Sequence, residues 1–256
     1  MHRSGVFHLN EFHALASFLL GRDRETSGYS EEDIVIHERR LGVSFPPSLR
    51  SYYRSFGQCP YLTPDGRNQY EPLMLADLFL PDEDFAEDEK EYLVFYQCAE
   101  SVIYCGIRLR DLTQEDPPVF IWVWGTPGWH LENRSLRNFL QSKVFIQIAL
   151  EGKLPYWAFV EESDWNRSDY SRVWSLREDF EEVVEEATIL AWKIYLNRDI
   201  LIVFELADPD CEESILAVHL ASFSEESLET LLLKMTQADK SPPYQTNLKN
   251  GWSGVK

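Results

Sequence analysis

Histidine, aspartate and glutamate are the side chains here that could carry acid–base or metal chemistry, but their spacing favours neither. The six histidines form no H-x-x-E-H or H-E-x-x-H pattern, which would bring two imidazoles to one metal ion. We therefore expect them to be surface residues or satisfied core residues. The chain has 43 acids, so carboxylate pairs follow from composition alone. A glycosidase needs two carboxyls roughly 5 to 9 Å apart across a cleft, which this sequence cannot specify.

The glycine loop 125–128 and the four cysteines supply no catalytic motif either. The loop lacks the lysine and the following serine or threonine that phosphate binding requires, so we predict a simple turn. No G-x-S-x-G elbow occurs, and the cysteines form no C-x-x-C pair. The sequence therefore predicts a non-enzymatic protein with no cofactor and no metal.

The segment 118–124, PVFIWVW, could bind a partner instead. Its alternation places Trp122 and Trp124 on one face of a strand. Exposed, that face would be an interaction patch. Large aromatic side chains are usually buried, however, so we expect the tryptophans to lie under a helix over 135–150. No basic patch frames these rings, which disfavours nucleic-acid binding.

The strong negative charge indicates either plain solubility or a basic protein partner. The formal net charge of −19 repels nucleic acid and anionic membranes, and it speeds association with basic proteins. Segment 81–91 has seven acids and one lysine, and segment 161–186 is also acidic. We expect both segments to contribute to partner binding. The candidate residues are Asp82, Glu83, Asp84, Glu87, Asp88, Glu161, Glu162, Asp164 and Trp165.

Two short helices precede the predicted strands. Ser30 can cap a helix that begins at Glu31, and Gly42 stands where a helix end favours a left-handed residue. The prolines that follow interrupt the helix, and Pro47 can begin a second helix that ends at Gly57. Strands are predicted over 93–96, 103–109 and 119–124, each rich in β-branched or aromatic residues, and we expect the first two to pair antiparallel.

The second half of the chain repeats this mixture of helices and strands. We predict a helix over 178–187 and a last helix capped by Ser224. Three strands are predicted at 188–196, 200–206 and 214–220. This half either forms its own α+β unit or extends the first sheet.

The predicted fold class is α+β, with a mostly antiparallel sheet flanked by helices and a C-terminal α+β extension. The predicted domains are 8–152, 153–240 packed on the first, and a flexible tail over 241–256. No run of about 18 apolar residues occurs, so we expect no membrane span, and the N-terminal residues have no apolar run suited to export. We expect a cytoplasmic protein with reduced cysteines.

A pattern across the two helices resembles the opening of the SUKH superfamily, which includes fungal cell-wall glucan synthesis regulators and bacterial toxin-immunity proteins. The matching residues are Ile36, Glu38, Leu41, Gly42, Phe45, Pro46, Leu49, Tyr52, Tyr53 and Gly57. Segments 118–124 and 135–140, with Trp129 between them, look like the closing strand and final helix of that family. The resemblance covers roughly residues 10 to 152, and Phe56 stands where many members carry asparagine.

The resemblance implies a protein-binding role, for which three readings stay open. In the first, the chain is an immunity protein that docks an acidic surface on a cognate toxin, possibly a nuclease, and neutralises it. In the second, it is an intracellular regulatory or scaffold protein, like the fungal members, and it binds a client without inhibiting a toxin. The third, an enzyme acting on glycans or nucleotides, would require a concave site with convergent carboxylates or histidines. The sequence does not indicate the oligomeric state.

Overall fold

The computed structural model divides the chain into two compact units, one ending at Gln141 and the other beginning at Ser142. This division falls inside helix α4 (Leu136–Leu150), whereas the sequence placed a domain boundary after residue 152. The structure describes residues 28–58, 70–82, 85, 89–98, 102–150, 154–161, 175–184, 191–197, 199–207, 211, 214–236 and 244–248.

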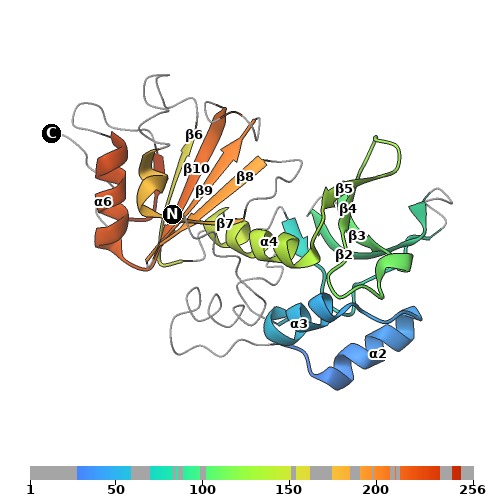
Figure 1. The fold of residues 1–256 in the computed structure, drawn as a ribbon. Helices are drawn as coiled ribbons and strands as arrows, with labels where there is room; N and C mark the ends of the chain where they lie inside the picture. Colours follow the sequence, from blue (N-terminus) through green and yellow to red (C-terminus); the bar gives the residue numbers. More distant parts are fainter. Residues whose placement is uncertain are drawn as a thin grey trace, which may run out of the picture. The chain divides into compact units, whose positions relative to one another are not determined.

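The first unit opens with the predicted helical hairpin, α2 (Glu31–Leu41) and α3 (Pro47–Phe56) (Figure 1). The Ser30 hydroxyl accepts a hydrogen bond from the backbone N–H of Asp33, whose carboxylate accepts one from the backbone N–H of Ser30. This capping box satisfies two donors that the first turn would leave unpaired. At the other end Gly42 has a φ of 70°, the left-handed conformation that ends helices. The predicted boundaries of both helices are confirmed.

A buried carboxylate holds the elbow between these helices. Glu38 Oε1 accepts a hydrogen bond from the backbone N–H of Phe45 at 2.6 Å, and it also pairs with the guanidinium of Arg50. Arg50 belongs to α3 and contacts Glu31 at the start of α2 as well. The glutamate in the pattern I-x-E-x-x-L-G is therefore structural, because it binds the elbow backbone and the next helix at once.

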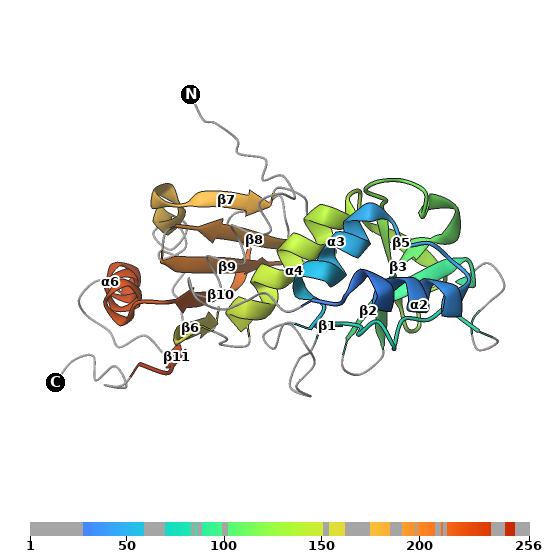
Figure 2. The ribbon, with the colours of Figure 1, turned by 90° about the horizontal axis from the view of Figure 1, so that it is seen from below.

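A five-stranded antiparallel sheet, here called sheet A, completes the first unit (Figures 1 and 2). Its strands are, in sheet order, β1 (Tyr70–Pro72), β2 (Tyr92–Cys98), β3 (Ile103–Arg108), β4 (Val119–Val123) and β5 (Trp129–Asn133). The predicted pairing of β2 with β3 and the predicted strand β4 are confirmed. The short edge strands β1 and β5 were not predicted. A 3-10 turn, η3 (Leu109–Asp111), follows β3.

One face of sheet A carries the core of this unit. Phe139, at the start of α4, meets the rings of Phe95 and Tyr96 edge-on, with centroids 5.7 and 5.5 Å apart. Tyr53 of α3 is fully buried, and its hydroxyl donates a hydrogen bond to the Leu73 carbonyl at 2.8 Å. Burial of aromatic rings from the helices against the sheet is the main source of stability expected for this unit.

The second unit contains a six-stranded antiparallel sheet, sheet B (Figures 1 and 2). Its strands are, in sheet order, β11 (Tyr244–Thr246), β6 (Tyr156–Glu161), β10 (Ile215–Ser222), β9 (Ile200–Leu206), β8 (Ala191–Leu196) and β7 (Glu181–Val184). The three strands predicted in this half correspond to β8, β9 and β10. Strand β11 lies in the segment predicted as a tail.

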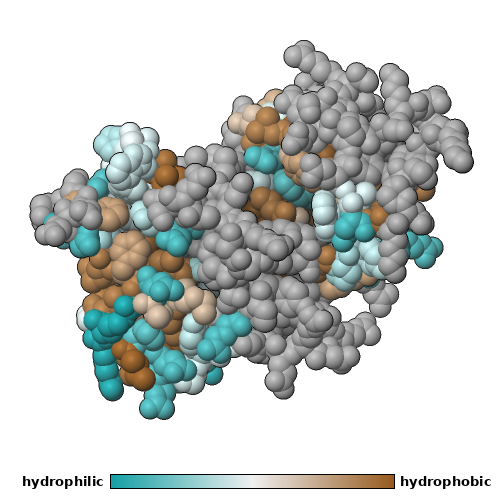
Figure 3. Space-filling model, turned by 180° about the vertical axis from the view of Figure 1, so that it is seen from behind, coloured by the Kyte–Doolittle hydropathy of each residue, from teal (hydrophilic) through white to brown (hydrophobic). Residues whose placement is uncertain are grey.

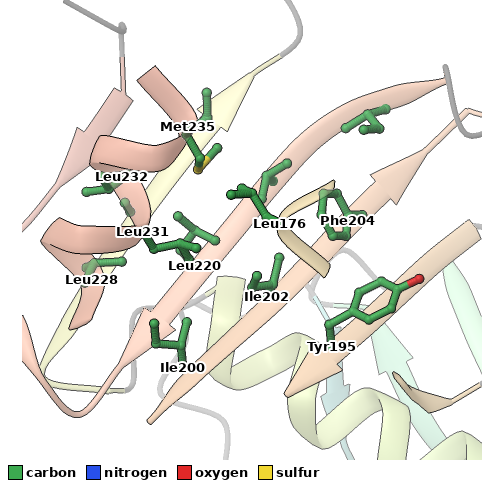
Figure 4. Close-up of a cluster of buried hydrophobic side chains, with 14 of the residues drawn as sticks. Leu176, Tyr195, Ile200, Ile202, Phe204, Leu220, Leu228, Leu231, Leu232 and Met235 are labelled. Atoms are coloured by element: carbon green, nitrogen blue, oxygen red, sulfur yellow. The ribbon is translucent and has the colours of Figure 1, made fainter. Parts of the chain in front are cut away.

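Helix α6 (Glu225–Thr236) and the 3-10 helix η6 (Leu176–Asp179) cover one face of sheet B. Figure 4 shows apolar side chains of α6 beside those of the central strands. The cluster includes Leu176, Tyr195, Ile200, Ile202, Phe204, Leu220, Leu228, Leu231, Leu232 and Met235. The predicted cap of α6 is confirmed, because the Ser224 hydroxyl accepts a hydrogen bond from the backbone N–H of Ser227.

The helix predicted over 178–187 is wrong. Residues 181–184 instead form β7, which pairs with β8 through Glu181 opposite Leu196. Two adjacent valines lower helix propensity and favour a strand once a partner strand is present. The two sheets share no strand, so the second half has a sheet of its own and does not extend sheet A. The predicted α+β class with antiparallel sheets is confirmed.

Candidate protein-interaction surface

The register of sheet A gathers aromatic side chains on the face opposite Phe139. Tyr104 lies opposite Trp122, and Trp122 lies opposite Trp129, so the three side chains share one face. Cys105 and Tyr96 lie opposite each other on the alternate, core face. We call the first face the tryptophan face. Its members are Tyr92, Val94, Gln97, Tyr104, Gly106, Arg108, Phe120, Trp122, Trp124, Trp129 and Leu131.

Large hydrophobic side chains reach the surface at several places. Figure 3 shows hydrophobic residues in patches beside hydrophilic ones on the side of the molecule drawn there. Trp124 is the most exposed of the large hydrophobic side chains described, at 73%, and Leu131 on the same face is 50% exposed. Tyr92 and Phe120 of the same face are buried, so its exposed apolar surface lies at Trp124 and Leu131.

Trp122 is the centre of an aromatic cluster on this face. Its ring centroid lies 5.2 Å from that of Phe85, 5.8 Å from that of Tyr104 and 6.0 Å from that of Trp124. The Trp124 ring meets it edge-on, at an interplanar angle of 78°. Such offset and edge-on pairs stabilise one another beyond simple burial. The cluster therefore holds an exposed indole beside a half-buried one.

The expected burial of both tryptophans under a helix is wrong. Helix α4 places Phe139 on the core face with Tyr96, whereas Trp122 and Trp124 lie on the opposite face. Every residue of the segment from 119 to 124 is apolar or aromatic. Its alternation consequently separates two faces without saying which one meets the helix.

A second aromatic cluster lies toward the other end of the strands. The Trp129 ring stacks on Tyr92, with centroids 4.2 Å apart and planes 13° from parallel. It also lies over Gly106, where an added Cβ would come within 3.1 Å of the indole. The Arg108 guanidinium lies 3.8 Å above the centre of Phe120, and its Nε donates to the Tyr92 hydroxyl at 3.0 Å. This cluster already has its own cation over one ring.

Glu89 ties the acidic segment to the tryptophan face. Its Oε1 accepts hydrogen bonds from the Trp122 indole N–H and from the backbone N–H of Gly128, both at 3.0 Å. Its backbone carbonyl accepts a third from the Trp129 indole N–H at 3.1 Å. With Phe85 against Trp122, two described positions of segment 81–91 contact this face. The face thus joins aromatic rings to an acidic stretch of chain.

Most of the predicted partner-binding residues lie outside the described residues. Asp82 is described and exposed, and Glu161 is the last residue of β6, opposite Ala217 of β10. The predicted residues outside the description are Glu83, Asp84, Glu87, Asp88, Glu162, Asp164 and Trp165. Sequence reasoning missed Phe85, Glu89 and Tyr104, although the position of the first two within the acidic segment was a usable signal.

The predicted turn at the glycine loop follows β4. Gly125 and Gly128 have φ values of 84° and 75°, which L-residues with side chains rarely adopt. The Thr126 hydroxyl and backbone N–H both donate to the Val123 carbonyl, at 2.6 and 3.0 Å. These contacts account for the loop as the tight link between β4 and β5.

One described histidine, on sheet B, lies beside a carboxylate. His219 is buried between Phe159 and Trp192, with ring centroids 4.7 and 5.8 Å away. Its Nε2 lies 3.7 Å from Glu205 Oε2, beyond hydrogen-bond distance.

The described residues hold no group of three or more His, Cys, Asp or Glu arranged to bind a metal ion. None of the described helices is long and apolar enough to span a bilayer.

Comparison with known proteins gives a match to part of the chain. Residues 28–142 match the model of the SMI1/KNR4 family (SUKH-1), a span that includes the helical hairpin, sheet A and the start of α4. No curated protein matches the chain. The matched span contains the elbow glutamate and the tryptophan face described above. Residues 28–142 therefore belong to the SUKH superfamily.

Proposed function

We propose that this chain is a non-enzymatic, cytoplasmic protein-binding module that neutralises a cognate protein toxin by docking an acidic surface on it. Membership of residues 28–142 in the SUKH superfamily supports a role in protein interaction. The net charge of −19 favours a basic partner, such as the cationic cleft of a nuclease toxin.

The observation that carries the proposal is the contact of Phe85 and Glu89, both in the acidic segment, with a sheet face on which Trp124 and Leu131 are exposed. Protein interfaces place aromatic anchors at their centre and charged groups around them. Trp124 and Leu131 supply exposed apolar surface, and Glu89 fixes the acidic segment against it. Charge then steers the partner, and the aromatic rings hold it once water is expelled.

Affinity capture tests whether a toxin is the partner. The purified full chain is exposed to lysate that contains the toxins of its own organism, at low salt and at about 0.5 M salt, where screening shortens the Debye length to a few ångströms. A toxin retained at low salt, released at high salt and inactivated by the chain is the expected result. Retention of a housekeeping enzyme or cell-wall factor instead would overturn neutralisation in favour of a regulatory role.

Two matched triple variants test the acidic surface. The first carries Asp82→Lys, Asp84→Lys and Asp88→Lys in the acidic segment. The second carries Glu32→Lys, Glu178→Lys and Glu226→Lys, at exposed positions elsewhere, with the same change in net charge. We expect the first to weaken toxin binding at least tenfold more than the second. Equal neutralisation by both would contradict docking through this segment.

A further inference from the structure

We propose that the outer edge of β6 is a strand-binding site, which segment 244–248 fills within one chain and which also takes the same segment from a second copy of this chain. The proposal concerns the second unit and does not depend on toxin binding. The occupant is identified by the contacts that segment 244–248 makes with β6.

Strand β6 has a partner strand on each side (Figure 2). Strand β10 pairs with one edge, and β11 pairs with the other through Tyr244 opposite Val160 and Thr246 opposite Ala158. Strand β11 has three residues and is the end strand of sheet B. A strand edge presents a row of backbone N–H and C=O groups, and an extended chain supplies partners at the matching spacing. The edge therefore specifies a β-strand as its occupant.

The side chain of Asn247 continues the strand pairing beyond β11. Its Oδ1 accepts a hydrogen bond from the backbone N–H of Trp157 at 2.9 Å, and its Nδ2 donates one to the Pro155 carbonyl at 2.8 Å. One amide side chain thus makes the two kinds of contact that a backbone peptide group makes in a β-ladder. Aspartate has no donor for the Pro155 carbonyl, and alanine has neither group, so the edge discriminates between side chains at this position.

Thr246 and Leu248 complete the recognised sequence. The Thr246 hydroxyl donates to the Trp157 carbonyl at 2.8 Å and accepts a hydrogen bond from the backbone N–H of Leu248 at 3.2 Å. Leu248 is 4% exposed and belongs to the apolar cluster of sheet B and α6. Segment 244–248 thus combines backbone pairing with a buried apolar anchor, which is how peptides bind by strand addition.

The position of segment 244–248 favours its release from β6 while sheet B stays folded. Strand β11 pairs with β6 alone, whereas the central strands β9 and β10 each pair with two neighbours. Asn247 is exposed, so water replaces its hydrogen bonds when the segment leaves. Short edge strands open at a lower free energy than central strands do. A second copy offers the same edge to the released segment, and exchange needs no new complementarity.

The net charge opposes the encounter of two copies. Each chain carries −19, so two chains repel each other at low salt. At about 0.5 M salt the Debye length falls to a few ångströms, and most of this repulsion is screened. Exchange between copies should therefore increase with salt, whereas docking of a basic toxin should weaken. This opposite salt dependence separates the exchange of segment 244–248 from toxin neutralisation.

Hydrogen exchange on the wild-type full chain tests the release of the segment. The backbone N–H of Trp157, which Asn247 holds, should exchange at least about a hundredfold faster than those of Val203 and Leu220 in the central strands. Equal rates would mean that segment 244–248 leaves only when the whole unit unfolds, and they would overturn the proposal.

A labelled peptide of residues 241–250 is the probe for binding between molecules, and a scrambled peptide of the same composition is the reference. Fluorescence anisotropy at about 0.5 M salt gives the Kd for the full-length wild type and its variants. The variant is Asn247→Ala, and the control is Thr230→Ala, at an exposed position on α6. Thr246→Val is a second variant, because it removes only the hydroxyl contacts. Thermal unfolding confirms that each variant is folded.

We expect Asn247→Ala to bind the peptide at least about tenfold more tightly than the wild type does, because its own segment competes less well for β6. Thr246→Val should act in the same direction, and Thr230→Ala should match the wild type. A peptide that itself carries Asn247→Ala should bind the loosened chain at least about tenfold more weakly. Equal affinities of the two variants and the wild type, or of the native, altered and scrambled peptides, would overturn the proposal.

Mixed dimers of full-length chains test whether a second copy is the occupant. Unlabelled and isotope-labelled wild type are combined at high concentration and high ionic strength, and native mass spectrometry detects dimers that contain one of each. We expect mixed dimers that an excess of the 241–250 peptide disperses and that its Asn247→Ala form does not. Dimers unaffected by the peptide would place the interface elsewhere and overturn the proposal. Peptide binding without mixed dimers would also overturn it, and would assign the edge to a segment of another protein.

Discussion

The carboxylate of Glu89 accepts a hydrogen bond from the indole N–H of Trp122, 33 residues further along the chain. The same oxygen accepts one from the backbone N–H of Gly128, in the turn between β4 and β5. One side chain therefore fixes the acidic segment, the central tryptophan and a tight turn together. Loss of this acceptor leaves two N–H groups without their partner.

Glu89→Ala should lower the free energy of unfolding by about 2 kcal/mol. Glu89→Gln should cost about half as much, since its amide oxygen can still accept but carries no charge. Urea unfolding measures both. The Trp122 indole N–H resonance should shift upfield in Glu89→Ala, because it loses a charged acceptor.

Glu91→Gln is the matched control for this prediction. Glu91 is exposed and lies two residues away, and its replacement should change stability by less than about 0.5 kcal/mol. A Glu89→Ala protein as stable as Glu91→Gln would show that the hydrogen bonds of Glu89 contribute nothing net to the fold.

Removal of the Glu38 carboxylate should lower the free energy of unfolding more than removal of the Glu89 carboxylate does. Glu38→Ala leaves the backbone N–H of Phe45 and the Arg50 guanidinium without their buried acceptor. We expect a loss of about 3 kcal/mol, the scale for breaking one side of a buried ion pair. Glu32→Ala, at an exposed position on the same helix, should cost less than about 1 kcal/mol. Similar urea midpoints for the two variants would argue against a structural role for Glu38.

The helical hairpin was predictable because its signals are local. A capping serine, a glycine at the helix end and two prolines act within a few residues, and the structure places Ser30 and Gly42 as predicted. The strand at 181–184 was missed because its pairing with β8 is tertiary. Local helix propensity in this acidic stretch favours a helix, but pairing with β8 stabilises a strand instead.

The candidate surface was only half predictable for the same reason. Alternation correctly placed Trp122 and Trp124 on one face, but it could not tell that α4 covers the other. The contact between Glu89 and Trp122 joins residues 33 positions apart and depends on tertiary packing. Nothing in the sequence pattern encodes that contact, and partner binding by the acidic segment stays a prediction.

Gly42 allows a test of the helix end that involves conformation alone. Its φ is 70°, and no atom lies within 4 Å of an added Cβ. Gly42→Ala should therefore cost about 1 kcal/mol from the left-handed backbone and nothing from a clash. Gly42→Asn should cost about half of that, because asparagine tolerates this conformation better. Equal urea midpoints for the alanine variant and the wild type would contradict this account.

Tyr53 predicts how stability changes in alkali. Burial raises the pKa of its hydroxyl well above the ordinary value of 10.0, while the hydroxyl donates to the Leu73 carbonyl. Because the folded pKa exceeds the unfolded one, the stability from protonated Tyr53 is complete below about pH 10. It is lost as the pH rises from there toward the folded pKa, at up to about 1.4 kcal/mol per pH unit.

Tyr53→Phe isolates this contribution, because phenylalanine keeps the ring and removes the ionisable group. At pH 7 the variant should be about 1 kcal/mol less stable than the wild type, since Leu73 loses its donor. As the pH rises above 10, the unfolded wild type ionises at Tyr53 and the variant cannot. The free energies of unfolding of the wild type and the variant should therefore become equal at about pH 11, as measured by urea unfolding followed by circular dichroism. Parallel curves from pH 7 to 11 would mean that Tyr53 ionises as readily in the folded chain as in the unfolded one, against its burial beside Leu73.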